Sequence, residues 1–401
     1  MSKPTFMINY ILFDDHWNDF LPLTFTRPVA ELRIGIMTIR EKWEKYLKTE
    51  VSWLTENFLQ EKFQLKIEED NIFINGSILP DEKIFQSIQS LKSGQSLAQA
   101  NILIASRYDK KSAIAFTNDI GKALNIVQFT GDIFKINFPW EVFQHNGKAI
   151  EADFKLLTTG RKSDSLNQTN NFSSLENIFV EDGAKVEFST LNASAGPIYI
   201  GKDAEVMEGC LIRGPFALGT HATLKMGAKI YGPTTIGPNS KVGGEINNCV
   251  IQGNSNKAHD GFLGNSVLGE WCNLGADTNN SNLKNNYTEV KLWSYSREKF
   301  VPTGLQFCGM IMGDHSKCGI NTMFNTGTVV GVSANIFGAG YPRNFIPSFS
   351  WGGANGLTVY PLDKSYETAS KVLQRRSLEL TETDKKILQQ IFIMTEKYRR
   401  F

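Results

Sequence analysis

An aliphatic residue recurs at every sixth position through part of this chain, and no other feature restricts its fold as strongly. The series covers eight positions in phase, and a small residue often follows each member: Ile200, Val206, Ile212, Leu218, Leu224, Ile230, Ile236 and Val242. An amphipathic helix needs a period of about 3.6 and a half-buried strand a period of about two, so neither explains the series. A parallel β-helix does, because each aliphatic side chain points into a narrow interior and small residues permit the following corner.

The repeat and the glycines mark the same zone of the chain. The repeat opens weakly at Val180 and resumes after two interruptions, at about 243–267 and 280–310. We expect both interruptions to leave the solenoid as loops. Of 34 glycines, 27 fall between Gly183 and Gly356 and none follows. We therefore predict a β-helix domain over residues 175–360, with glycines at its corners.

The regions on either side have different patterns. Residues 1–157 alternate short apolar runs with helical stretches, which predicts a small α/β domain with a mainly parallel sheet. Its expected strands and helices are strands at 6–13, 51–54, 71–75, 102–105 and 112–116, and helices at 29–48 and 82–92. Residues 158–174 are polar and resemble a linker. In the tail, 361–401, we expect a helix capped by Thr381 or Thr383 that packs on the solenoid end or on a neighbouring subunit.

Global composition excludes several classes of protein. The 42 Lys and Arg nearly balance the 41 Asp and Glu, so a nucleic-acid binder that works through a bulk basic field is excluded. No apolar run approaches the ~20 residues of a membrane-spanning helix. The five cysteines include no C-x-x-C pair, and we interpret them as reduced, buried thiols of a cytoplasmic protein.

The segment after the first expected strand carries a motif. Ligands of open α/β sheets bind beyond the carboxyl ends of the strands, and residues 14–35 read D-D-H-W-N-D-F-L-P-L-T-F-T-R-P-V-A-E-L-R-I-G there. P-L-T-x-x-x-P followed by glycine is similar to the signature of sugar-1-phosphate nucleotidyltransferases. The variant T-R-P-x-A-E-L-R-x-G resembles a Bacteroidetes-type branch of that family. The usual glycine-rich phosphate loop is replaced by D-D-H-W-N-D.

This resemblance implies roles for particular residues. Thr24, Arg27 and Arg33 would bind the phosphorylated substrate, since guanidinium groups bind phosphate in a bidentate way. A Mg²⁺ ion would be held by Asp14, Asp15 and Asn146, the last within an E-V-x-x-x-N stretch similar to one near the end of uridylyltransferase domains.

A second motif lies in the repeat region. Residues 243–282 include N-K-A-H-D-G-F-L-G and N-L-G-A-D-T-N-N-S-N. They resemble the acetyltransferase half of the bifunctional N-acetylglucosamine-1-phosphate uridylyltransferase / glucosamine-1-phosphate N-acetyltransferase family, whose hexapeptide repeats form a left-handed parallel β-helix. The resemblance implies that His259 is catalytic and that a group of neighbours binds the substrate: Lys257, Phe262, Asn273 and Asn282. We also consider Arg343 for the phosphates of coenzyme A.

The two resemblances together imply a cytoplasmic, homotrimeric, bifunctional enzyme. It would acetylate glucosamine-1-phosphate or a similar amino-sugar phosphate from acetyl-CoA, and transfer a nucleotidyl group from UTP with Mg²⁺ to give UDP-N-acetylglucosamine. Histidine suits the acetyl transfer, since it can remove the amine proton near neutral pH. Three alternatives stay open: one active domain beside a binding module, a non-catalytic scaffold, and a trimeric zinc carbonic anhydrase using His221, His259 and His315.

Overall fold

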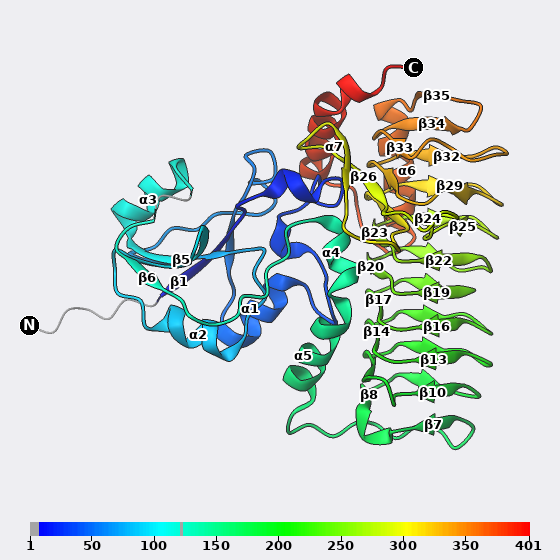
Figure 1. Ribbon diagram of the computed structural model, residues 1–401, viewed down its shortest axis with the longest axis horizontal. Helices are drawn as coiled ribbons and strands as arrows, with labels where there is room; N and C mark the ends of the chain where they lie inside the picture. The colour runs from blue at the N-terminus through cyan, green and yellow to red at the C-terminus, as the bar shows by residue number, and fades with distance from the viewer. Residues whose placement is uncertain (1–7, 121–122) are drawn as a thin grey trace, which may run out of the picture. The chain divides into compact units, whose positions relative to one another are not determined.

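The computed structural model describes residues 8–120 and 123–401, so residues 6 and 7 of the first expected strand lie outside the described residues. The chain forms two compact units. The α/β unit comprises the described residues up to Phe20, Arg27–Leu32 and Met37–Asn137. The β-helix unit comprises Leu21–Thr26, Arg33–Ile36 and Phe138–Phe401. Figure 1 colours the elements of both units along the chain. No helix among the described residues is long and apolar enough to cross a membrane.

The α/β unit is built on a six-stranded mixed sheet in the order β2-β1-β3-β5-β4-β6. Its strands are β1 (Asn9–Phe13), β2 (Ser52–Leu54), β3 (Asp70–Asn75), β4 (Gln95–Gln99), β5 (Ile102–Asp109) and β6 (Ile126–Gln128). β1 runs parallel to β2 and β3, and β4 to β6, while β5 is antiparallel to both β3 and β4. The α/β prediction is confirmed, with an antiparallel strand in the middle of the sheet.

Side-chain caps set the starts of the helices in this unit. They are α1 (Ile39–Leu47), α2 (Glu82–Gln89) and α3 (Lys110–Asn118), with a single 3-10 turn each at η1 (Trp17–Phe20) and η2 (Val29–Glu31). Thr38 and Glu41 form a capping box at α1, which fixes the start of a helix expected to begin at residue 29. The strand expected at 112–116 is wrong: Asp109 accepts a hydrogen bond from Ser112 N and starts α3 there, with Phe116 in the apolar core.

The β-helix unit consists of three parallel sheets, and each coil of the chain contributes to them in turn (Figure 1). Sheet 1 contains β7 (Asn171–Ser173), β10 (Thr190–Asn192), β13 (Leu211–Arg213), β16 (Lys229–Tyr231), β19 (Glu245–Asn247) and β22 (Phe262–Gly264). Sheet 2 contains β8 (Ile178–Val180), β11 (Ile198–Ile200), β14 (Phe216–Leu218), β17 (Thr234–Ile236), β20 (Val250–Gly253), β23 (Val267–Glu270), β28 (Met310–Met312), β31 (Thr328–Val330) and β33 (Phe345–Ile346).

Sheet 3 is the longest and ends in an antiparallel hairpin. Its strands are β9 (Lys185–Val186), β12 (Glu205–Val206), β15 (Thr223–Leu224), β18 (Lys241–Val242), β21 (Asn256–Lys257), β24 (Asn273–Leu274), β29 (Lys317–Cys318), β32 (Asn335–Ile336), β34 (Ser350–Gly353) and β35 (Gly356–Val359). A separate parallel pair joins β25 (Asn279–Asn280) and β30 (Met323–Phe324). All eight aliphatic residues of the six-residue series are buried in the interior, which confirms the predicted β-helix.

The two expected interruptions have different structures. Residues 243–267 do not leave the solenoid: Val242 pairs with Lys257 and Ile236 with Ile251, fifteen residues further along the chain. The frame slips there because the corners are shorter, so this expected loop is wrong. The interruption at 280–310 does leave it, as the hairpin β26 (Lys291–Ser294) and β27 (Lys299–Pro302).

The glycines act through space more than through backbone angle. Gly219 directly follows an interior aliphatic residue, and a Cβ there would lie 2.7 Å from Pro238 N of the next coil. The left-handed corner between sheets 2 and 3 is held instead by side-chain-bearing residues, Asp203, His221, Asn239, Asn254, Trp271, His315 and Ser333. Glycine is therefore needed mainly where successive coils approach closely.

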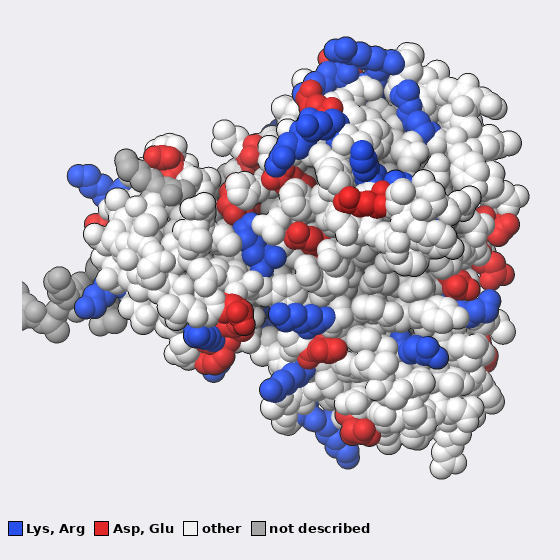
Figure 2. Space-filling view, in the orientation of Figure 1, with Lys and Arg blue, Asp and Glu red and all other residues white. Residues whose placement is uncertain are grey.

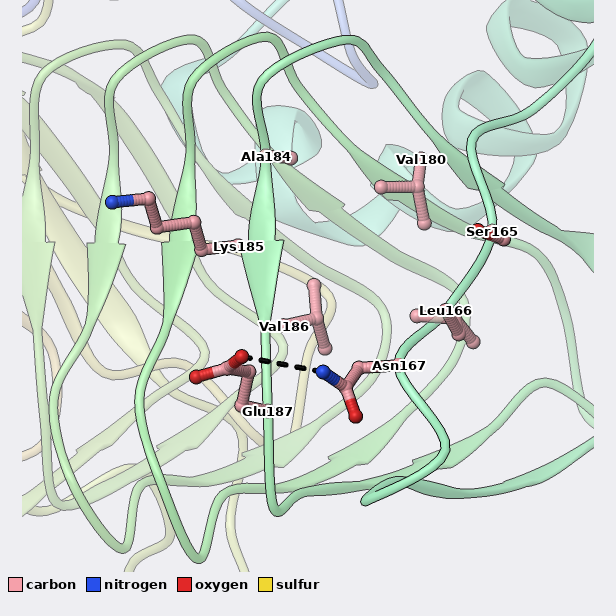
Figure 3. Close-up of a pocket in the computed structure, with 8 residues that line it drawn as sticks. All are labelled: Ser165, Leu166, Asn167, Val180, Ala184, Lys185, Val186 and Glu187. Atoms are coloured by element: carbon pink, nitrogen blue, oxygen red, sulfur yellow. Dashed lines mark hydrogen bonds between the residues drawn. The ribbon is translucent and has the colours of Figure 1, made fainter.

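Other elements cover the ends and one face of the β-helix. Leu166, in the segment expected to be a linker, packs against the interior beside Val180 and Val186 at the first coil (Figure 3). At the other end lie α6 (Leu362–Gln374), α7 (Glu382–Met394) and the turn η4 (Glu396–Tyr398), and Thr381 caps α7 as predicted. The helices α4 (Pro139–Gln144) and α5 (Asn146–Thr158) also belong to this unit; Ile150 of α5 packs on Phe179, Tyr199 and Ala217 of sheet 2. A last 3-10 turn is η3 (Leu175–Asn177).

Candidate functional site

The corner between β21 and β22 carries His259 at an open cavity. The side chain is exposed, and the cavity of about 630 Å³ is also lined by Lys225, Met226, Gly243, Gly244, Ala258, Asp260, Ala276 and Asp277. No described group makes a hydrogen bond to the His259 imidazole. A Cβ on Gly244 would lie 2.9 Å from His259 O, so glycine is required for the preceding coil to approach this corner. The histidine is thus accessible to a ligand and carried by rigid neighbouring coils.

Lys257 fixes the backbone of this corner from inside. It occupies an interior position of sheet 3 in register with Val242, and only 1% of its surface is exposed. Its Nζ donates to Gly243 O (3.2 Å), His259 O (2.6 Å) and Asp260 O (3.1 Å). Burial lowers its pKa to about 8. The ammonium group points toward the interior, and its three hydrogen bonds hold the backbone of the corner in place, so Lys257 acts as a brace for that corner.

Two of the other predicted substrate-binding residues meet near this corner. Phe262 and Asn282 both flank Gly264, where a Cβ would lie 2.5 Å from the phenyl ring and 2.7 Å from the Asn282 amide. Asn282 Nδ2 donates to Asn265 Oδ1 at 2.7 Å, a partner that the sequence did not single out. Asn273 is exposed on sheet 3 and lines a different cavity. The structure therefore brings together two residues of this set and separates the third.

The remaining histidines and Arg343 lie elsewhere on the β-helix. His221 and His315 occupy left-handed corners between sheets 2 and 3, whereas His259 lies between sheets 3 and 1. Within the described residues of this chain, no three His, Cys, Asp or Glu side chains are placed to hold a metal ion. Arg343 is exposed between β32 and β33 and lines neither of these cavities. The five cysteines are free and buried, in agreement with the expectation from the sequence.

In the α/β unit, polar side chains gather where β1 and β3 end. Asp15 Oδ2 accepts a hydrogen bond from Asn75 Nδ2 at 2.9 Å and lies 3.3 Å from Lys135 Nζ. Ser77 Oγ donates to Asp15 Oδ1 at 3.3 Å. The sequence pattern placed Asp15 and Asn75 at strand ends, but Lys135 and Ser77 carried no signal. The Asp15 carboxylate thus already has a cation and two hydrogen-bond donors.

Asp14 is half-buried and used within the fold. Its Oδ1 accepts from Val29 N at 2.9 Å and its Oδ2 from Thr55 Oγ1 at 2.6 Å. Burial is the main cause that raises its pKa to about 7. These two hydrogen bonds make Asp14 a structural link between η2 and the segment that directly follows β2.

The glycine end of the family signature is clamped within the β-helix unit. The Arg33 backbone N–H donates to Gln252 Oε1 at 2.6 Å, and Arg33 Nε donates to Gln252 O at 3.2 Å. Gly35 N donates to Asn146 Oδ1 at 2.7 Å, an oxygen that also accepts from Thr235 Oγ1 at 3.1 Å. The signature residues here position the chain, and both Arg33 and Asn146 are buried.

The other predicted residues of this motif are also enclosed. Thr24 is fully buried in the β-helix unit, and Arg27 is 7% exposed in the α/β unit. Asp14 and Asp15 belong to the α/β unit, whereas Asn146 belongs to the β-helix unit. Each unit therefore holds part of the residues that the resemblance grouped as one site.

Comparison with known proteins identifies the first part of the chain. The family model described as "Sugar nucleotidyl transferase" matches residues 10–162. A "Bifunctional sugar-1-phosphate nucleotidylyltransferase/acetyltransferase" of Sulfurisphaera tokodaii is 29% identical over 216 residues, which cover 53% of this chain and 47% of the relative. A "Bifunctional protein GlmU" of Methanocaldococcus jannaschii is 33% identical over 87 residues, covering 22% of this chain and 21% of the relative. The chain thus spans half or less of the length of these relatives.

Solved structures with similar chains are acyltransferases by title. A UDP-N-acetylglucosamine acyltransferase of Arabidopsis covers 58% of this chain and 91% of its own, at 15% identity and a TM-score of 0.24. A similarity this low supports no argument, and the β-helix is established by the strand pairing itself. The family match, by contrast, confirms the resemblance drawn from P-L-T-x-x-x-P. Residues 10–162 of this chain therefore match the sugar nucleotidyl transferase family, and they are followed in the same chain by a parallel β-helix.

Proposed function

We propose that this protein is a bifunctional enzyme that acetylates an amino-sugar 1-phosphate, glucosamine-1-phosphate by preference, and joins the product to a nucleotide. Acetyl-CoA and UTP would be the donors and UDP-N-acetylglucosamine the product. The observation that carries the first activity is the accessible His259 at an open corner of the β-helix. The names of the relatives support the pairing of the two activities.

In the acetyl transfer, the amine nitrogen attacks the thioester carbonyl carbon and the carbon–sulfur bond breaks. His259 accepts the proton that the amine loses, and the released thiolate takes up a proton to become the free thiol. A positioned general base of this kind contributes about 10²–10⁴-fold to the rate. Phe262 and Asn282 would bind the sugar beside the histidine, and Lys257 would hold the corner that carries it.

In the nucleotidyl transfer, an oxygen of the sugar 1-phosphate attacks the α-phosphorus of UTP and pyrophosphate leaves. The side chains predicted to hold Mg²⁺ do not form a resident metal site by themselves. Asp14 is bound to Val29 N and Thr55, and Asn146 to Gly35 and Thr235. The side chain of Asp15 is 19% exposed. We therefore propose that Mg²⁺ arrives with the triphosphate.

Two finer features belong to the same proposal. A homotrimer is expected, since the His259 cavity is open on one side and a neighbouring copy would close it. A cytoplasmic location fits the five free, buried cysteines, which disulfide-forming compartments disfavour.

A two-stage assay on the full chain tests the proposal. Glucosamine-1-phosphate, acetyl-CoA, UTP and Mg²⁺ are supplied, and free thiol and pyrophosphate are followed separately. His259→Asn should abolish thiol release, whereas His221→Asn, at a left-handed corner that asparagine tolerates, should not. Thiol release at the wild-type rate in His259→Asn would overturn the acetyl-transfer assignment. Absence of pyrophosphate with pre-acetylated sugar would leave the α/β unit as a binding module.

A further inference from the structure

A second cavity of the β-helix unit is lined by four basic side chains and no acidic one. It lies between the outer face of sheet 3 and the end of α6 and has a volume of about 350 Å³. Lys241 and Lys317 come from the sheet and Arg375 and Arg376 from the helix end, with Asn254, Asn256, Trp271, Cys272, Asn273 and Val372 completing the lining. Figure 2 shows basic and acidic side chains interspersed on the face that it draws, whereas the charged side chains that line this cavity are all basic.

The sheet wall of the cavity is a ladder in exact register. Lys241 pairs with Asn256, Asn256 with Asn273, and Asn273 with Lys317, on four successive coils. Neighbouring strands lie about 4.8 Å apart, so the ladder places two amides between two ammonium groups. The same outward position three coils earlier is occupied by Lys185, which has the acidic Glu205 as its neighbour in register.

The helix wall is held in place from behind. Arg376 donates to Asn239 O at 2.6 Å, and its guanidinium lies 6.0 Å from the centre of the Trp271 ring. That ring stacks on His315, with ring centres 6.3 Å apart, and Lys317 Nζ donates to His315 O at 2.8 Å. Lys317 and Arg376 are therefore pre-oriented, and each keeps further N–H groups for a ligand.

The charges in the cavity have no counter-charge on the described residues. No described carboxylate lies within ion-pair distance of any of the four cations. Partly buried cations that are not paired are costly to a fold. One acceptor is also unsatisfied: Asn256 Oδ1 is buried without a hydrogen-bond partner among the described groups. The cavity thus offers cations for an anion and an acceptor for a hydroxyl.

We propose that this cavity is a binding site for the phosphate groups of a nucleotide, with Lys241, Lys317, Arg375 and Arg376 as its cations. Two sources share this chemistry: a free nucleoside di- or triphosphate and the nucleotide portion of coenzyme A. The site lies on sheet 3, away from the residues that line the His259 cavity; the coenzyme A source rests on the proposed acetyl transfer, and the free nucleotide does not. Asn256 would accept a hydrogen bond from a ribose hydroxyl.

Binding should depend on pH in a defined direction. Burial lowers the pKa of Lys317 to about 8, and a bound anion would raise it by favouring the ammonium form. The cavity places Arg375, Arg376, Lys241 and the buried Cys272 around Lys317. The carboxylate of the region is that of Asp314, which is buried and accepts hydrogen bonds from Thr26 Oγ1 and Glu270 N. Affinity for phosphate should therefore be highest below pH 8 and fall above it.

The test is calorimetric titration of the full chain with pyrophosphate, UDP, coenzyme A and uridine at low ionic strength, with hydrogen–deuterium exchange as the site-specific readout. The three phosphorylated ligands should slow exchange at β24 and at the end of α6, and uridine should not. Lys241→Gln and Arg375→Gln, both at exposed positions, should each weaken binding about tenfold, as expected for one charge-assisted hydrogen bond. Lys185→Gln and Lys371→Gln are the matched controls in the same sheet and the same helix, and should bind as wild type.

The outcomes separate the two sources and the two proposals. If coenzyme A slows exchange at these elements, is displaced by pyrophosphate, and UDP does not slow exchange, the site belongs to the coenzyme. If UDP slows exchange there, the site belongs to free nucleotides. No protection by any of the three ligands, or protection unchanged in Lys241→Gln/Arg375→Gln, would overturn the proposal. His259→Asn should bind these ligands normally, so loss of acetyl transfer and loss of this site are distinguishable.

Discussion

In the α/β unit, Asp14 and Asp15, which follow β1, already have hydrogen-bond partners. In the β-helix unit, the ring of His259, at the corner after β21, has no hydrogen-bond partner among the described residues. Asp15 faces Lys135, Asn75 and Ser77, and Asp14 holds Val29 and Thr55. His259 opens on a cavity while Lys257 supports its backbone from inside. The comparison teaches that a matched family motif can serve the fold in one region and leave reactive groups accessible in another.

The largest effect should come from the accessible group. His259→Asn should lower acetyl transfer by about 10²–10⁴-fold, because a general base is lost, and leave the free energy of unfolding within about 0.5 kcal/mol, because the side chain is exposed. Thiol release and urea denaturation measure the two quantities. If pyrophosphate release from pre-acetylated sugar fell equally, the separation between the two regions would be wrong.

The half-buried carboxyl group of Asp14 in the α/β unit should make stability depend on pH. The pKa of Asp14 is about 7 in the folded chain against 3.8 for an unperturbed carboxyl, so the folded state binds the proton more tightly between these values. Stability should therefore fall as pH rises from about 4 to 7, by on the order of 4 kcal/mol. Urea denaturation across this range measures the slope. Asp14→Asn should flatten it, while Asp132→Asn, at an exposed position, should leave it unchanged.

Gly35 tests whether the family signature serves the fold. Its φ is +77°, and a Cβ there would lie 2.5 Å from Asp153 Oδ2 and 2.8 Å from Ala149 C. Gly35→Ala should cost about 3 kcal/mol, part from the left-handed backbone and part from the collision. Gly160 has φ +75° with nothing within 4 Å of a Cβ, so Gly160→Ala should cost only about 1 kcal/mol. Equal losses in thermal denaturation would contradict a packing role for Gly35.

Lys257 links stability and activity within the β-helix. Lys257→Met keeps the side-chain length but removes the ammonium donor from Gly243 O and His259 O, and one of the two donors from Asp260 O. This loss should cost about 2 kcal/mol. Acetyl transfer should also fall, since the corner carrying His259 loses its brace, and nucleotidyl transfer should persist. The exposed Lys229 of β16 provides the control, Lys229→Met, with unchanged stability and activity. Normal acetyl transfer in Lys257→Met would show that the brace is not needed.

Much of the β-helix was predictable because its information is local and repeated. A side chain at every sixth position either faces a narrow interior or does not, and the series from Ile200 to Val242 is buried throughout. The frame slip at 243–267 misled the prediction, since a shorter corner and an inserted loop leave the same gap in a periodic pattern. The α/β unit was harder to predict. Residues 112–116 are apolar enough for a strand, but the N-cap at Asp109 starts the helix α3 there.

The sequence by itself determined the β-helix, the class of the N-terminal domain and the candidates at Asp15 and His259, because periodicity and motif spacing are properties of the chain alone. Only the tertiary structure decided which of these groups are accessible. Burial and hydrogen bonding depend on neighbours far along the chain: Gln252 on Arg33, Asn146 on Gly35, and Lys257 beneath His259. The basic cavity likewise exists only because α6 returns to sheet 3 and brings two arginines to two lysines that no sequence pattern connects.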